Sequence, residues 1–233
     1  MNELPFETSR EIKDDSNSIK YSALLYIIGK MVHVIALGLA TVIIWIAQPG
    51  LTALFPWHPT LMAVGFGFLM TEAILMFSPQ SSVFPSSTRA TKAQIHWMIQ
   101  AISITCTSLG FAAIFFNKKQ RGKDHFTSWH GLFGLITMIL VLLQAFQGIS
   151  IYYQKFSLMK ASLGQRKQLH ALFGVLVFTL ACVTIVLGYF SNWFVKNVND
   201  AVWWGSVLST LAMAGVIIGQ VTNEYVARNK PLK

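Results

Sequence analysis

The sequence predicts an all-helical integral membrane protein with six transmembrane helices. Of its 233 residues, 54% are hydrophobic and only 12% are charged, against about 25% charged residues in soluble proteins. Mean hydropathy is +0.53. Six apolar segments are each about as long as the roughly 20 residues that a helix needs to cross a bilayer. Because backbone groups in lipid must hydrogen-bond internally, we expect all six to be helices.

The apolar segments follow one another with short polar connections. Residues 1–20 are polar, and we expect them to form a solvated cytosolic tail without regular structure. Residues 21–225 form the predicted membrane domain, and residues 226–233 a second cytosolic tail. The six segments are 22–47, 58–77, 95–116, 129–152, 169–190 and 202–221. The connections that end them are Gln48-Pro49-Gly50, Ser78-Pro79-Gln80, residues 117–128, residues 154–167 and residues 191–200.

The basic residues give the chain a net charge of +9, but they lie between the apolar segments rather than in one tract. This distribution is typical of membrane orientation and not of nucleic-acid binding. With the N-terminus in the cytosol, thirteen of the 18 Lys and Arg fall on the cytosolic side. Both termini are therefore predicted to be cytosolic, although the basic connection 117–128 runs against the rule. The two cysteines lie inside apolar segments and indicate no disulfide framework.

Four histidines each stand near the start of one of the four middle segments. They are His58, His96, His130 and His170, with spacings of 38, 34 and 40 residues. Each interval equals one segment plus one connection, so consecutive histidines lie at opposite membrane faces. His58 should therefore pair with His130, and His96 with His170, within a four-helix core made by segments two to five. Two imidazoles that face each other across a helical bundle are the axial ligands of a b-type haem.

Two other interpretations of the histidines remain at this stage. Polar residues are tolerated at helix ends, and a single interfacial histidine would need no further explanation. Zinc is a second option, but it binds three or four ligands at one point, whereas the topology supplies two at each face. Four histidines at matching depth favour two haem sites.

A short motif repeats around two of these histidines. H-x-L-F-G occurs at His130 and again at His170, and a glycine follows each histidine by 18 residues, at Gly148 and Gly188. Eighteen residues make five helical turns, so each glycine shares its histidine's helix face. We expect these glycines to leave a gap that a macrocycle could fill; helix-to-helix packing is the alternative. The same two interpretations apply to Gly65 and Gly110.

Six segments with these four histidines resemble the cytochrome b561 family of transmembrane ascorbate-dependent reductases. The resemblance extends over nearly the whole chain. It implies two b haems, cytosolic ascorbate as the electron donor, and monodehydroascorbate radical or ferric iron as the acceptor on the far side. That side would be the lumen of the endoplasmic reticulum or of vesicles. The motifs that carry it are WHPTLM at 57–62, FLMTEAILMFSP at 68–79, IHW at 95–97, GKDH at 122–125, WHG at 129–131 and QVTN at 220–223.

Charged residues near the histidines are the candidate substrate contacts. Those before the cytosolic pair could bind an anionic donor, or could serve only as positive-inside anchors; they are Arg89, Lys92, Arg166 and Lys167. Lys123 and His125 precede His130 and could receive the acceptor, or belong to a solvated loop.

Two ionisable residues inside the segments have no assigned role in this scheme. Glu72 follows His58 by 14 residues, which on a regular helix places it near the cytosolic haem, where it could bond a haem edge or a basic side chain or move a proton. His33, in the first segment, is expected to be a hydrogen-bonded structural histidine.

The sequence leaves two alternative functions open. A dihaem quinone oxidoreductase is the alternative enzyme, and a histidine-lined transporter or proton channel is the alternative outside enzymes. Membrane lipid is the expected environment, and the sequence also leaves open whether the chain forms a homodimer.

Overall fold

The structure, a computed structural model, describes residues 4–156 and 160–228. Within those ranges every regular element is a helix, and six stretches are long and apolar enough to cross a membrane. The predicted all-helical class with six membrane-spanning segments is confirmed. The elements are α1 (Leu4–Ala47), α2 (Trp57–Met62), η1 (Ala63–Met70), α3 (Thr71–Leu75), α4 (Arg89–Gln120), α5 (Trp129–Tyr152), η2 (Gln154–Phe156), α6 (Leu163–Tyr189), α7 (Asn192–Asn197) and α8 (Asp200–Arg228).

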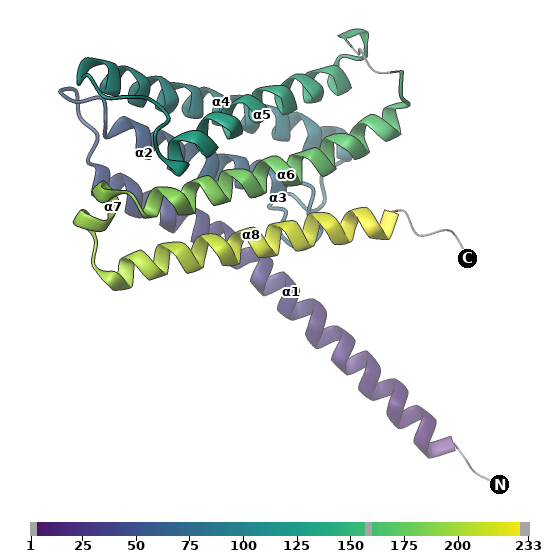
Figure 1. The fold of residues 1–233 in the computed structure, drawn as a ribbon. Helices are drawn as coiled ribbons and strands as arrows, with labels where there is room; N and C mark the ends of the chain where they lie inside the picture. Colours follow the sequence, from purple (N-terminus) through teal and green to yellow (C-terminus); the bar gives the residue numbers. More distant parts are fainter. Residues whose placement is uncertain (1–3, 157–159, 229–233) are drawn as a thin grey trace.

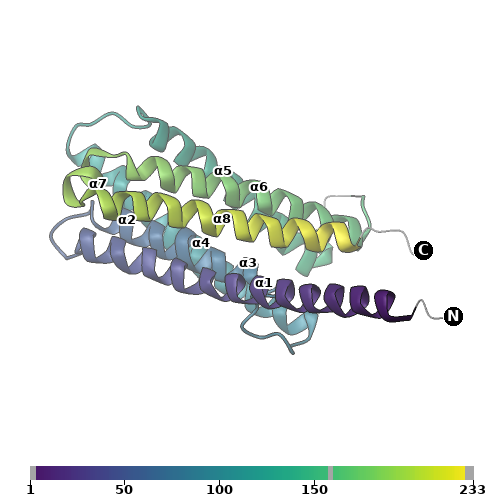
Figure 2. The ribbon, with the colours of Figure 1, turned by 90° about the horizontal axis from the view of Figure 1, so that it is seen from below.

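The long helices run alongside one another in a single bundle (Figure 1). Around it, α2 and η1 pack on α4, α5 packs on α6, α6 on α8, α8 on α1, and α1 on η1. The start of α1 and the end of α8 lie at the same end of the bundle in both ribbon views (Figure 2).

The first helix is longer than the sequence predicted. Residues 4–20, expected to lack regular structure, continue α1 back to Leu4, and this stretch projects beyond the bundle in Figure 1. The reason is local: Pro5 falls in the first turn, where its missing N–H is not needed, and no glycine interrupts residues 6–20.

Two helices begin earlier than their apolar segments, because polar residues cap them. Thr88 accepts a hydrogen bond from the Thr91 backbone N–H at the start of α4. Ser162 and Gln165 form a reciprocal capping box at the start of α6, a pattern that fixes a helix N-terminus. The basic residues predicted in the connections at these two points consequently lie in the first helical turns.

The second span contains a π-helix. The segment η1 joins α2 to α3 and carries the sequence AVGFGFLM. A π-helix uses bonds from residue i to i+5 and is wider than an α-helix, so residues after it no longer follow the α-helical register counted from His58.

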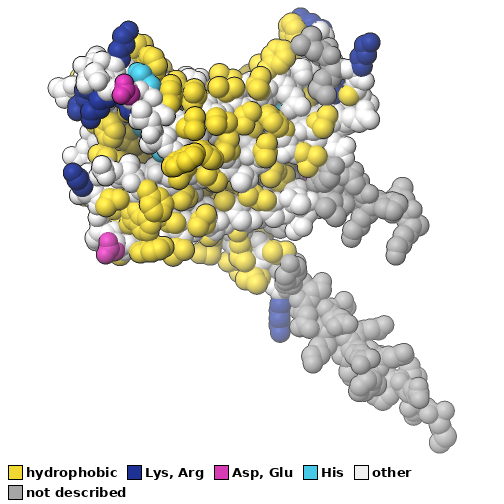
Figure 3. All heavy atoms as spheres, viewed as in Figure 1, with side chains coloured by type: hydrophobic (Ala, Val, Ile, Leu, Met, Phe, Trp, Pro, Cys, Tyr) yellow, Lys and Arg dark blue, Asp and Glu magenta, His cyan; other side chains and the backbone are white. Residues whose placement is uncertain are grey.

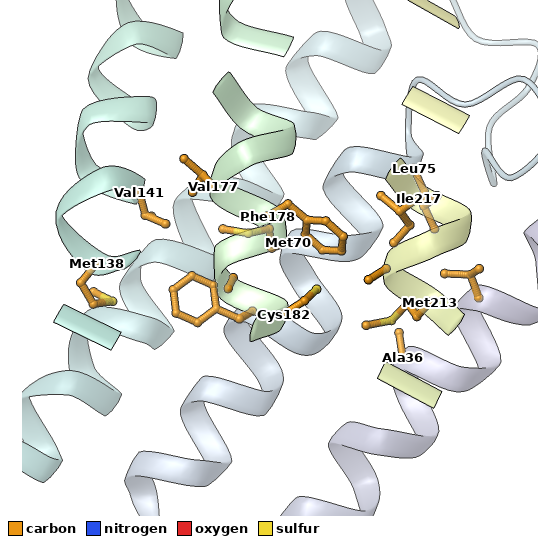
Figure 4. Packing of buried hydrophobic residues seen from close by; sticks show 14 residues of the cluster. Ala36, Met70, Leu75, Met138, Val141, Val177, Phe178, Cys182, Met213 and Ile217 are labelled. Carbon is orange, nitrogen blue, oxygen red and sulfur yellow. The ribbon is translucent and has the colours of Figure 1, made fainter. Parts of the chain in front are cut away.

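Buried apolar side chains fill the middle of the bundle between its two ends. The main cluster draws residues from α1, η1, α3, α5, α6 and α8, and Figure 4 shows their side chains meeting between the helices. Phe178 lies eight residues after His170 and is 2% exposed. On the face seen in Figure 3, hydrophobic side chains cover the middle of the molecule and Lys and Arg gather toward the ends. Such a surface suits contact with lipid and not with water.

Candidate functional site

At one end of the bundle, His58 and His130 face each other; we call this the His58–His130 end. Their ring centres are 6.0 Å apart and the rings cross at 77°. His58 Nδ1–H donates to the Gly110 carbonyl oxygen at 3.0 Å, and His130 Nδ1–H donates to that of Thr184 at 2.9 Å. Both carbonyls come from neighbouring helices. These bonds fix both rings and assign their hydrogens, which leaves each Nε2 with a free lone pair.

At the other end, His96 and His170 form a similar pair; we call this the His96–His170 end. Their ring centres are 6.3 Å apart and the rings cross at 82°. His96 Nδ1–H donates to the Ala73 carbonyl oxygen at 2.7 Å. His170 differs, because its Nδ1 is buried without a hydrogen-bond partner, and its Nε2 lies 3.5 Å from Gln144 Nε2. The structure thus brings the four histidines together in the pairs that the spacing predicts.

The two pairs lie at different depths in their helices. His58 and His130 are the second residues of α2 and α5, whereas His96 and His170 lie seven residues after the first residues of α4 and α6. Only the first pair therefore opens its helices as the sequence indicated. The capped early starts of α4 and α6 place the second pair about two turns inside.

The repeated glycines each lie against a histidine ring of the opposite helix. A Cβ atom at Gly188 would lie 3.1 Å from His130 Cε1, and one at Gly148 would lie 3.2 Å from His170 Cε1. Because α5 and α6 are antiparallel, the glycine at the end of one helix lies level with the histidine at the start of the other. Each glycine therefore makes room for the imidazole opposite, and the expectation that a macrocycle fills a gap at these glycines stays a prediction.

Gly65 and Gly110 also serve close approach between helices. A Cβ at Gly65 would meet Thr107 and the Ser103 carbonyl of α4, and one at Gly110 would meet Leu61 of α2. Helix packing, the alternative that the sequence left open, accounts for both.

Buried polar atoms without partners gather around His170. Gln144 Oε1, Gln147 Oε1, Arg166 Nε and His170 Nδ1 are all buried and make no hydrogen bond. Arg166 is only 5% exposed, and its Nη1 donates to the Ser150 carbonyl oxygen at 3.0 Å. Among the side chains that the structure describes, no carboxylate pairs with this cation. Buried polar groups normally have partners, so this cluster is suited to a polar or anionic group that the protein itself does not supply.

A cavity of about 280 Å³ adjoins the His58–His130 end, and both histidines line it. Its rim includes His125, which stacks on Phe115 with ring centres 4.2 Å apart. Lys118 also lines the cavity and donates to the Asp124 carbonyl oxygen at 2.7 Å. Lys123, predicted together with His125, is exposed and is not part of the lining. The sequence indicated the basic connection but singled out Lys123 rather than Lys118.

A second cavity, of about 290 Å³, adjoins the His96–His170 end. Arg89 and Lys92 line it with Glu224, whose carboxylate lies 3.9 Å from the Arg89 guanidinium. Phe77 lines the same cavity and packs against His96 with ring centres 5.4 Å apart. The cavity is therefore one aromatic ring away from His96.

The four basic residues predicted at this end do not form one group. Arg89 and Lys92 share the cavity, whereas Arg166 is buried between α5 and α6 and Lys167 is exposed outside the cavity lining. Sequence reasoning also missed Gln144 and Gln147, although two glutamines in an otherwise apolar span are a recognisable signal.

Glu72 does not face the histidine pairs as a regular helix predicts. Both its carboxylate oxygens lie 2.8 Å from His33 Nδ1, on α1. The π-helix η1 between His58 and Glu72 explains the difference in direction. A bond to a basic side chain was one of the roles that the sequence left open, and His33 is hydrogen-bonded as expected.

No group of three or more His, Cys, Asp or Glu side chains able to hold a metal ion occurs in residues 4–156 and 160–228. The tetrahedral zinc alternative therefore gains no support from this part of the chain. Two opposed imidazoles instead suit an ion whose remaining ligands come from another molecule, such as the nitrogens of a porphyrin.

Comparison with known proteins identifies the family in which this arrangement of four histidines occurs. The model of the eukaryotic cytochrome b561 family matches residues 57–195, which include all four histidines. The transmembrane reductase CYB561D2 of Mus musculus is 38% identical over 93% of this chain and 96% of its own length, and that of Bos taurus is 37% identical with the same coverage. The lysosomal membrane ascorbate-dependent ferrireductase CYB561A3 of Mus musculus is 31% identical over 61% of this chain and 57% of its own.

Family membership carries the cofactor class and the general activity with it. Cytochromes b561 bind haem b, and the similar proteins carry the name transmembrane reductase. Six apolar helices agree with a multi-pass integral membrane protein. The chain belongs to the eukaryotic cytochrome b561 family of transmembrane reductases.

Proposed function

We propose that this protein carries single electrons across a membrane from cytosolic ascorbate, through two b haems, to an acceptor on the other side. The acceptor would be monodehydroascorbate radical or ferric iron. His96 and His170 would hold the haem on the cytosolic side, and His58 and His130 the haem on the far side. The observation that carries the proposal is the presence of two opposed imidazole pairs, one at each end of an apolar bundle.

The residues present fit haem b at both ends. Three of the four imidazoles donate Nδ1–H to a backbone carbonyl, which fixes the tautomer that leaves Nε2 able to bind iron. Haem bound by these residues would supply one-electron redox chemistry at its iron. The protein holds the rings in place and keeps water from the interior between the two ends.

Arg166 supports haem binding at the His96–His170 end in particular. A buried cation without a counter-ion costs several kcal/mol in free energy, and haem b carries two propionate groups. A propionate near Arg166 would offset that charge, and the unpaired amide oxygens nearby could accept hydrogen bonds from water or from a protonated carboxyl group.

The donor assignment rests on the cavity beside His96. Arg89 and Lys92 line it, and ascorbate is a monoanion at neutral pH, so both side chains would attract it. The printed name of the similar ferrireductase from Mus musculus describes that protein as ascorbate-dependent. On the far side, Lys118 and His125, which line the cavity at the His58–His130 end, are the candidate acceptor contacts, with Lys123 outside it.

The distribution of basic residues supports a cytosolic location for both termini, including residues 1–20 and 226–233. Membranes of the endoplasmic reticulum or of cytoplasmic vesicles are the proposed location, because they separate cytosolic ascorbate from a lumenal acceptor.

Haem stoichiometry is the first experiment. Purified protein assayed as the pyridine haemochrome should contain two haems b per chain. A value of one or none would contradict the proposal. Ascorbate added to the outside of proteoliposomes should then reduce a ferric complex trapped inside, and protein-free liposomes provide the baseline.

A further inference from the structure

His33 and Glu72 form a partly buried pair, with side chains 17% and 16% exposed, that electron transfer as described does not use. The His33 ring lies with Nδ1 2.8 Å from both carboxylate oxygens and with Nε2 2.7 Å from the Ser81 carbonyl oxygen. A carbonyl only accepts, so Nε2 carries a hydrogen. A contact of 2.8 Å between Nδ1 and a carboxylate needs another hydrogen between them. The pair therefore holds a proton that either partner can own.

Few other charges lie near this pair. On α1, one turn before His33, Lys30 Nζ donates to the Ser81 and Ser82 carbonyl oxygens at 3.2 and 3.0 Å. From α8, the uncharged Gln220 accepts hydrogen bonds from the hydroxyls of Ser78 and Ser81. The next acidic group along α8 is Glu224, which lies at the cavity beside Arg89.

The pair is connected to the His96–His170 end through one residue of α3. Glu72 binds His33 through its side chain, and the next residue, Ala73, accepts the Nδ1–H of His96 through its carbonyl oxygen. The connection 76–88 adds a second link: Ser81 binds His33, while Phe77, Pro79, Pro85 and Ser87 line the cavity beside His96. We therefore expect a change of charge on the pair to act mainly on the His96–His170 end, because the other histidine pair lies at the opposite end of the bundle.

We propose that His33 and Glu72 form a redox-linked proton site: the pair takes up a proton from the cytosolic side when the His96–His170 end gains an electron, and releases it when the electron moves on. This inference rests on the proposed function, because it needs a haem between His96 and His170.

Charge balance gives the reason. An electron gained at the His96–His170 end would add one negative charge inside a medium where charges are poorly screened. In the oxidised protein the pair holds one shared proton and is neutral overall. A second proton, taken from water, would protonate the carboxylate beside an imidazolium and give the pair a charge of +1, which offsets the added electron. The electron comes from the reductant and the proton from the cytosol. When the electron moves on to the other end, the pair releases the one proton that it took up.

The test is a redox titration of the dihaem protein at several pH values, with a chemical reductant in place of ascorbate. In the parent protein, the midpoint potential of the haem lost in His96→Ala should fall as pH rises. The limit is about 59 mV per pH unit, which corresponds to a tenfold change for one electron. Glu72→Gln retains an oxygen that accepts from His33 but removes the second proton's position, and should flatten this dependence. His33→Asn is the second variant and should do the same.

The other haem and a matched variant are the controls. The midpoint potential of the haem lost in His58→Ala should be unchanged by Glu72→Gln. Ser78→Ala removes a hydrogen bond to Gln220 in the same region without removing a titratable group, and should keep the parent slope. A pH-independent potential in a dihaem parent, or the parent slope in both Glu72→Gln and His33→Asn, would overturn this inference alone. A chain that binds no haem would overturn the proposed function and this inference with it.

Discussion

The two ends of the bundle carry nearly the same histidine geometry in different surroundings. Ring centres are 6.0 Å apart at one end and 6.3 Å at the other, and glycines of α5 and α6 seat one imidazole at each end. The His58–His130 end, however, lies in the first helical turns beside a cavity rimmed by aromatic side chains. His96 and His170 lie about two turns inside their helices, near buried amide oxygens and a buried arginine. Through Ala73 this end is also linked to the His33–Glu72 pair.

This difference indicates how one bundle could give two similar haems different properties. The ligands are alike, so any difference in reduction potential must arise from the surrounding charge, hydrogen bonding and solvent access. The buried amide oxygens and the buried arginine lie at the His96–His170 end, whose cavity is lined by Arg89 and Lys92. Direction of transfer would then be determined by the surroundings of the histidines and not by the histidines themselves.

The largest expected effect is the loss of one haem. His58→Ala or His130→Ala should remove the haem at their end and spare the other, and His96→Ala or His170→Ala should do the reverse. Reduced-minus-oxidised absorbance spectra and haem content measure this directly. His33→Ala should retain both haems, since His33 binds Glu72 and Ser81. If His58→Ala and His96→Ala removed the same haem, the pairing would be wrong.

Substitution of the glycines beside the histidines should cause a smaller loss of haem, by steric displacement of one imidazole at one end of the bundle. Gly188→Leu should displace the His130 ring and lower haem content at that end, whereas Gly148→Leu should displace His170 and affect the opposite end. Gly205→Leu is the matched control, because an added Cβ at Gly205 meets nothing within 4 Å. Haem content per chain, with circular dichroism to confirm that the helices remain, is the measurement. Equal haem loss in all three variants would point to general destabilisation.

Hydrophobicity and periodic spacing were enough to predict six helices and the pairing of four histidines, because span length and topology leave few arrangements. The direction of Glu72 could not be predicted, since one π-helical stretch changes the register of every residue after it. The role of Gly148 and Gly188 depends on the helix opposite, which spacing along one helix does not reveal. The depth of His96 and His170 follows from Thr88 and Ser162, whose capping patterns are visible in the sequence but outweighed by hydropathy.

Arg166 offers a test of the electrostatic difference between the ends. Arg166→Met should lower the midpoint potential of the haem at the His96–His170 end, because a buried positive charge favours the reduced state. A unit charge about 10 Å away at an effective dielectric constant of about 20 contributes roughly 1–2 kcal/mol, so the fall is on the order of 60 mV. Arg166→Lys should retain most of the parent potential, and the other haem should not change. Equal shifts at both haems would argue against a local effect.

The smallest expected effect concerns the donor, and it separates residues that the sequence grouped together. Arg89 and Lys92 line the cavity beside His96, whereas Lys167 is exposed outside it. Lys92→Gln should therefore slow reduction by ascorbate, and Lys167→Gln, which removes the same charge on the same side, should not. The effect should be at most about fivefold, because an exposed charge contributes about 1 kcal/mol or less.

Stopped-flow reduction in vesicles, with ascorbate added on one face, measures this rate. The difference between parent and Lys92→Gln should shrink as salt is raised, since the Debye length is about 8 Å at physiological ionic strength. A neutral reductant should show little difference between them, because charge steering acts on the association of charged donors. Equal slowing by Lys92→Gln and Lys167→Gln at full haem occupancy would mean that ascorbate responds to the net charge of this face. The cavity beside His96 would then not be its binding site, and both lysines would act only through the overall positive charge of this face.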